Sequence, residues 1–181
     1  RYALTLQINV DDFRIKNALV DRARTAGIGI LGTANSAANF CSNIVLDYAV
    51  IDNVGLPTSI TGKGLDIAHS SDVVVGQVKV SNVTGRALDI RGTSVTNARR
   101  ITIIGPIAVS ESRQAGQIEF VDTVRGDLVQ SVARAANSYG LVVKDCSDVV
   151  ASAYIRGVTD SLPSLTLQNC TGVVQFEATI V

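Results

Sequence analysis

Several residue types are absent from this chain or scarce in it. It has no Trp and no Met, 4% aromatic residues, three Pro and one His among 181 residues. Its apolar residues, 46% of the chain, are therefore mainly Val, Ile, Leu and Ala, which favours strands of β-branched residues over a core built around aromatic rings. The single His excludes a His-rich metal site.

Charge of one sign and long hydrophobic runs are also lacking. Sixteen Lys and Arg balance sixteen Asp and Glu, so we expect no nucleic-acid partner, which would call for a basic excess. No apolar run approaches the roughly 18 residues of a membrane span, so we expect no membrane insertion. The start at Arg1 shows neither Met nor an apolar leader. We therefore expect a single domain, residues 1–181, that is a fragment or processed piece of a longer chain.

A repeated pattern dominates the sequence. A small residue shortly before an apolar-x-apolar strand recurs, and four of the six steps between successive copies are 23 or 24 residues. The first apolar residues of the copies are Leu4, Ile28, Leu65, Leu88, Ile118, Leu141 and Leu165. A second strand often follows about eight residues later, after a polar turn pair such as Ser42-Asn43 or Ser71-Asp72. Three short strands per repeat describe one coil of a stacked all-β solenoid.

Two other repeat readings fit less well. A leucine-rich repeat has a similar period, but its LxxLxLxxN signature and a helical stretch per repeat are missing. A β-sandwich does not require positions to recur in register. The pattern resembles the right-handed parallel β-helix (pectin-lyase-like) superfamily, which includes pectate lyases and phage tailspikes, over nearly the whole chain. The resemblance implies a right-handed single-stranded parallel β-helix of about seven coils of roughly 23 residues, and it is specific for fold rather than activity.

Three insertions interrupt the period, at residues 33–43, 53–63 and 92–100. Insertions in a solenoid become loops beside the strands, where binding sites are often built. These loops are expected to border the first sheet and to wall a groove there, or else to be tolerated surface loops.

Acidic residues follow the first apolar position in three successive repeats. Because side chains alternate along a strand, Asp66, Asp89 and Glu119 are expected to point outward at the same offset. Neighbours in such a column lie about 5 Å apart, and its ends about 10 Å apart. Arg91 and Lys144 are expected to stand beside it.

This column has three interpretations. Carboxylates at these separations suit glycoside hydrolysis, which makes Asp66, Asp89 and Glu119 the candidate catalytic residues. Stacked carboxylates also suit Ca²⁺, the one cofactor considered, with Arg91 as the base of a lyase, as the resemblance to pectate lyases implies. The third interpretation is an exposed charged face with Asp–Arg pairs worth under about 1 kcal/mol each. The absence of vWiDH-like and RxPxxR-like strings counts against lyase chemistry.

The three cysteines share one position of the repeat. Cys41, Cys146 and Cys170 each stand three residues before a second strand, in one column with Ser70. Cys146 and Cys170 fall on adjacent coils, at a separation that a disulfide could span. The odd number of cysteines and the lack of a leader favour free thiols.

The viral branch of the superfamily is favoured by the ends of the chain, which show no polar cap. Further chain or partner subunits would have to cover them, and phage tailspikes form homotrimers. The resemblance then implies a virion tail appendage that recognises bacterial cell-surface polysaccharide. A second hypothesis is that the appendage also depolymerises this polysaccharide. Arg91, Lys144 and Tyr139 are the candidate substrate-binding residues. The alternatives are a secreted, monomeric pectin-lyase-like lyase or glycoside hydrolase, and a structural stalk without ligand.

Overall fold

The fold was analysed in a computed structural model. It describes residues 2–33, 39–56, 58–93, 98–105, 107–131, 139–155 and 165–180. These residues form strands and turns, and among them is no helix long and apolar enough to cross a membrane.

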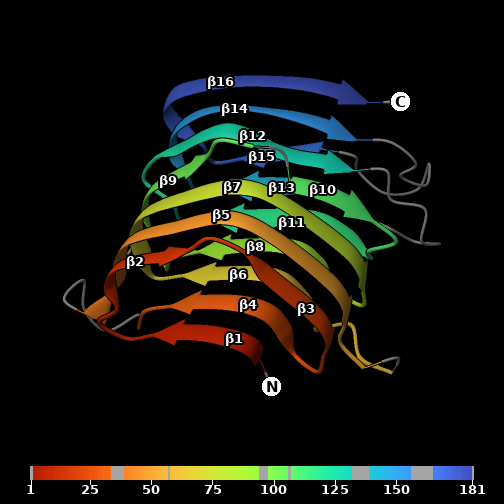
Figure 1. Ribbon diagram of the computed structural model, residues 1–181. Helices are drawn as coiled ribbons and strands as arrows, with labels where there is room; N and C mark the ends of the chain where they lie inside the picture. Colours follow the sequence, from red (N-terminus) through yellow and green to blue (C-terminus); the bar gives the residue numbers. More distant parts are fainter. Residues whose placement is uncertain are drawn as a thin grey trace.

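Two parallel sheets make up the solenoid (Figure 1). The first has seven strands, which in spatial order are β1 (Tyr2–Gln7), β4 (Ala26–Leu31), β6 (Lys63–Ala68), β8 (Arg86–Arg91), β11 (Gln114–Glu119), β13 (Tyr139–Lys144) and β15 (Leu165–Gln168). Spatial order follows chain order, as stacking of successive turns requires. The predicted all-β parallel solenoid is confirmed.

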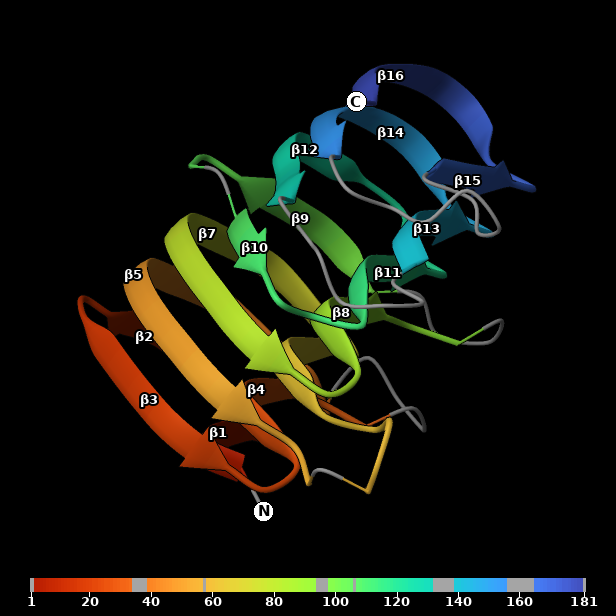
Figure 2. The same ribbon diagram turned by 90° about the vertical axis from the view of Figure 1, so that its right-hand side faces the viewer.

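The second sheet has nine strands and forms the other side of the stack (Figure 2). Its main path runs through β2 (Asp11–Ile15), β5 (Cys41–Val54), β7 (Ser70–Val83), β10 (Ile107–Ser110), β12 (Val124–Ser131), β14 (Ser147–Ile155) and β16 (Thr171–Ile180). Beside that path, β3 (Ala18–Ala23) pairs with β5, and β9 (Arg99–Ile103) pairs with β7 and β12. The N- and C-termini lie at opposite ends of the stack (Figure 1).

The turns are longer than expected. Paired residues of the first sheet lie from 23 residues apart, at Leu65 and Leu88, to 37 apart, at Ile28 and Leu65. About five turns follow one another about 28 residues apart, so the expected seven coils of roughly 23 residues are wrong. Loops between strands, such as residues 55–62, lengthen individual turns beyond the minimum that three short strands need.

Aliphatic side chains from both sheets fill the interior. Leu65, Ile67, Leu88 and Ile90 alternate with outward-pointing residues on β6 and β8, and all four are fully buried. Pairing of Leu65 with Leu88 and of Ile67 with Ile90 stacks like on like between turns. Each strand thus contributes a rung to one continuous core, and no turn needs to bury its inner face alone.

Turn chemistry at the corners is as predicted. Asn43, Asp72 and Asp148 adopt positive φ angles of 52°, 55° and 49°, the left-handed conformation that Asn and Asp tolerate. They stand at the bend that opens each second strand. Gly172 takes the same role in the last turn, with φ of 69°.

The cysteine column is also confirmed. Cys41 pairs with Ser70 between β5 and β7, and all three cysteines are free thiols. Cys146 is buried and donates through Sγ to the carbonyl oxygen of Lys144, whereas Cys170 is half-buried. Burial raises the pKa of the Cys146 thiol to about 12, which disfavours the reactive thiolate at this position.

Candidate functional site

Asp66 and Asp89 stand side by side on the outer face of the first sheet. They are paired in the register of β6 and β8, with Leu65 and Leu88 pointing inward beside them. This part of the predicted acidic column is confirmed.

Glu119 does not continue that column. Gln117 is the residue that pairs with Asp89, while Glu119 pairs with Arg91 and Lys144. The expected register is wrong by two residues because Gly116, not Ile118, occupies the inward position of Leu88. A Cβ at Gly116 would lie 3.1 Å from Leu141 Cδ1 and 3.2 Å from Leu88 Cβ, so neighbouring leucines fill the space that the glycine leaves.

Cations cover the two aspartates. The side chains of Asp66 and Asp89 are 0% and 1% exposed although they point away from the core. Arg91 donates through Nη1 to both carboxylates, at 2.6 Å to Asp66 Oδ1. Lys63 Nζ lies 2.5 Å from Asp89 Oδ2 and 3.3 Å from Asp66 Oδ2. Arg86 donates through Nη1 to Asp89 Oδ1 at 3.0 Å.

Tyr2 completes this cluster from β1. Its hydroxyl donates to Asp66 Oδ2 at 3.1 Å. Burial, reinforced by the Asp66 carboxylate, raises the pKa of Tyr2 to about 12. Burial by itself would lower the pKa of Arg91, but the two carboxylates outweigh it and raise that pKa. We call the set the outer-face ion network; its members are Tyr2, Lys63, Asp66, Arg86, Asp89 and Arg91.

The ion network limits what the two carboxylates can do. A general acid must reach the oxygen that it protonates, and these carboxylates are enclosed by side chains that already donate to them. Binding of calcium is also disfavoured, because Lys63 and Arg91 occupy the positions beside the carboxylate oxygens that the ion would need as ligands. Within the described ranges, no three His, Cys, Asp or Glu side chains are grouped to hold a metal ion. The catalytic role of Asp66, Asp89 and Glu119 stays a prediction.

Glu119 and Lys144 form a separate ion pair on β11 and β13. Lys144 Nζ lies 2.6 Å from Glu119 Oε1, and Gln117 Nε2 donates to Glu119 Oε2 at 2.6 Å. The hydrogen bond to Glu119 raises the pKa of Lys144. Of the residues predicted to bind substrate, Arg91 belongs to the ion network and Lys144 to this pair. The backbone of Tyr139 pairs with Gln114, but its side chain lies outside the described part of the structure.

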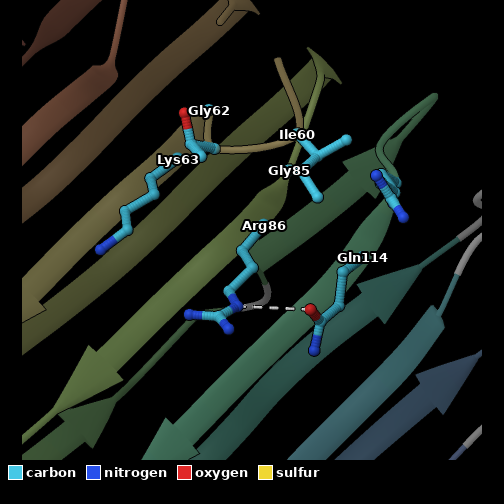
Figure 3. A pocket seen from close by; sticks show the side chains of 8 residues that line it. Ile60, Gly62, Lys63, Gly85, Arg86 and Gln114 are labelled. Carbon is cyan, nitrogen blue, oxygen red and sulfur yellow. Dashed lines mark hydrogen bonds between the residues drawn. The ribbon is translucent and has the colours of Figure 1, made fainter.

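A cavity of about 380 Å³ opens next to the ion network, at the corner where β6, β8 and β11 begin (Figure 3). It is lined by Ile60, Thr61, Gly62, Lys63, Gly85, Arg86, Arg113 and Gln114. The volume lies within the roughly 300–1,000 Å³ of small-molecule sites. One of the three predicted insertions, residues 53–63, contributes half of the lining, so this loop does wall a cavity beside the first sheet.

Hydrogen bonds fix the polar side chains of the cavity. Lys63, Arg86 and Gln114 occupy the same register position on successive strands. Gln114 accepts from Arg86 Nε at 3.3 Å and donates through Nε2 to the carbonyl of Gly116 at 3.1 Å. Figure 3 shows the ammonium end of Lys63 directed away from Ile60, in keeping with its contacts to the aspartates. Arg86 is thereby held between the ion network and the cavity.

Sequence reasoning placed residues 60–63 in a wall-forming loop but missed Arg86, Arg113 and Gln114 as cavity residues, although one signal was present. Lys63-Gly-Leu-Asp66 and Arg86-Ala-Leu-Asp89 repeat a cation three residues before an outward carboxylate, in the same register. That repetition indicates a ladder of ion pairs rather than a bare acidic column. Nothing in the sequence singled out Arg113, which precedes the strand that carries Gln114.

Comparison with protein-family models, with curated proteins and with solved structures finds no match to this chain.

Proposed function

We propose that this chain binds a bacterial cell-surface polysaccharide on the outer face of its first sheet, as the receptor-binding domain of a virion tail appendage. The observation that carries the binding proposal is the cavity lined by Arg86, Arg113 and Gln114. Rigid polar groups that converge on a cavity are the usual mark of a ligand site. A stack of turns also presents such a site beside a long, regular face, which suits an extended polymer.

Binding without cleavage is the version that the ion network favours. The enclosed carboxylates of Asp66 and Asp89 hold Arg86 and Arg91 in fixed positions, which is what a preformed binding surface needs. Depolymerisation by Asp66, Asp89 and Glu119, with the domain as a secreted lyase or hydrolase, is the second candidate. The observation in its favour is that two of these carboxylates stand on adjacent strands.

The proposal includes finer features of the assembly. We infer a right-handed β-helix of the pectin-lyase-like superfamily, because parallel strands joined by crossovers are right-handed in about 98% of cases. We also infer a homotrimer, as in tailspikes. Sedimentation equilibrium tests this: a species three times the 19.0 kDa of one chain supports the trimer, and a monomer contradicts it.

A panel of immobilised capsular and O-antigen polysaccharides tests the function. The labelled chain should be retained by one or a few of them, and its incubation with those should release no new reducing ends. Retention by none contradicts the proposal. New reducing ends or unsaturated products, abolished in D89N while circular dichroism shows an intact fold, would replace it with the depolymerase.

A further inference from the structure

The cavity beside the ion network has an uneven balance of charge. Its described lining residues include three cations, Lys63, Arg86 and Arg113, and no carboxylate. The two aspartates behind it are outnumbered by Lys63, Arg86 and Arg91, to which they are paired. Adding Arg113 leaves a local excess of two positive charges. An electropositive cavity of this kind attracts an anionic ligand.

Unused hydrogen-bond donors point to what the ligand carries. A guanidinium has five N–H donors, and among the residues that the structure describes Arg86 donates from Nε to Gln114 and from Nη1 to Asp89 and from no other nitrogen. Its Nη2 group remains for a ligand. Arg113 is half-buried at the cavity, and within the described part of the chain its guanidinium has no carboxylate partner. Arg113 thus offers a complete two-pronged donor, and Arg86 adds a further nitrogen.

The opposite side of the cavity is apolar. Ile60 is 64% exposed, and Figure 3 shows it across the cavity from the side-chain ends of Arg86 and Gln114. A ligand that fits both sides has an anionic group at one end and a C–H surface at the other. A carboxylated sugar has this character, because its carboxylate stands on one edge of a ring whose faces carry C–H groups.

We propose, building on the polysaccharide-binding function above, that this cavity takes the carboxylate of an acidic sugar, a uronate or a sialate-type residue, between Arg113 and Arg86. The planar fork of Arg113 matches the two oxygens of a carboxylate. Gln114 acts as a positioning residue, since its amide holds the Arg86 guanidinium in place. Ile60 packs against the sugar ring.

Titration of the arginine Nε–H signals by NMR tests this on the intact chain. The probes are the methyl glycosides of glucuronate and N-acetylneuraminate, with methyl glucoside, sulfate and phosphate as comparisons at constant ionic strength. The Arg113 signal should shift saturably with one or both carboxylated glycosides and not with methyl glucoside. Equal shifts with sulfate or phosphate, or none with either carboxylated glycoside, would overturn the proposal.

Variants of matched charge sharpen the test. R113Q should weaken binding of the responsive glycoside roughly tenfold to a hundredfold, the range for a hydrogen bond to a charged group. R125Q removes the same charge from an exposed position on β12 of the second sheet and should leave binding unchanged. Equal losses in both variants would indicate general charge attraction and overturn the site. Thermal melts confirm that each variant is folded.

Carboxyl reduction separates this proposal from the function on which it rests. If a polysaccharide retained on the panel is retained equally after its carboxylates are reduced to alcohols, the carboxylate site is wrong and polysaccharide binding stands. If no polysaccharide is retained but glucuronate binds at Arg113, the site stands and the proposed function is wrong. Loss of retention after reduction supports both.

Discussion

Loss of the Arg91 guanidinium tests the ion network most directly. Arg91 donates to both buried carboxylates, and its own side chain is 32% exposed. In Arg91→Gln each aspartate keeps other partners: Asp66 retains Lys63 and the Tyr2 hydroxyl, and Asp89 retains Lys63 and Arg86. The variant therefore weakens the compensation of two buried charges without abolishing it for either.

The expected cost follows from that count. Removing the only partner of a buried charge costs about 3–5 kcal/mol. Because Asp66 keeps one cation, Lys63, and Asp89 keeps two, Lys63 and Arg86, we expect Arg91→Gln to lower the free energy of unfolding by about 2–4 kcal/mol. Urea unfolding at neutral pH measures this as a lower midpoint with an unchanged slope.

Arg14→Gln is the matched control for that measurement. Arg14 donates to both oxygens of Asp47, at 2.7 and 2.8 Å, but the two side chains are 61% and 32% exposed. An exposed pair of this kind is worth about 0–1 kcal/mol and is screened by salt. Arg91→Gln should cost more than Arg14→Gln and keep its effect at high salt. Equal, salt-sensitive effects would refute the buried network.

Three further predictions concern other residues. The pKa of Tyr2 is raised from 10.0 to about 12, so its contribution to stability is present below pH 10 and is lost as the pH rises through about 12. The difference in unfolding free energy between wild type and Y2F should therefore shrink between pH 10 and about 12, and a constant difference would contradict this. Gly64→Ala should lower the melting temperature far more than Gly116→Ala. A Cβ at Gly64 would lie 2.4 Å from the backbone oxygen of Ala87, whereas a Cβ at Gly116 would come no closer than 3.1 Å, to the movable side chain of Leu141. Equal melting temperatures of the two variants would count against this packing. An aromatic disulfide reagent should label Cys170 before Cys146, because Cys146 is buried and its thiol has a pKa of about 12. Mass spectrometry that finds Cys146 labelled first, or Cys146 bonded to Cys170, would contradict the structure.

The stack of parallel strands was predictable because one local rule repeats. A small residue, then apolar residues at alternate positions, marks β6 and β8, and there it aligned Leu65 with Leu88 and Asp66 with Asp89 correctly. The rule fails at β11, where Gly116 stands at the inward position opposite Leu88, and the next apolar residue, Ile118, lies two residues further along the strand, opposite Ile90. A pattern that counts only apolar side chains cannot see a glycine whose space is filled from neighbouring turns.

Burial of the aspartates was not predictable from alternation alone. An outward position on a strand is ordinarily exposed, but two partners of Asp66 come from far away in the chain: Tyr2 is 64 residues distant and Arg91 is 25. Their meeting depends on the lengths of the intervening loops, which the repeat does not specify. The cavity has the same origin, because residues 60–62, 85 and 113 converge only when three turns are stacked.

Hydrogen exchange of the chain with and without a retained polysaccharide tests the central claim, that the cavity at the corner of the first sheet is the binding site. Bound polysaccharide should slow amide exchange at residues 60–63, 85–86 and 113–114, and R113Q should abolish this protection. Protection confined to the other side of the 55–62 loop, around Arg22, Arg24 and Asn82, or to the second sheet, would contradict it.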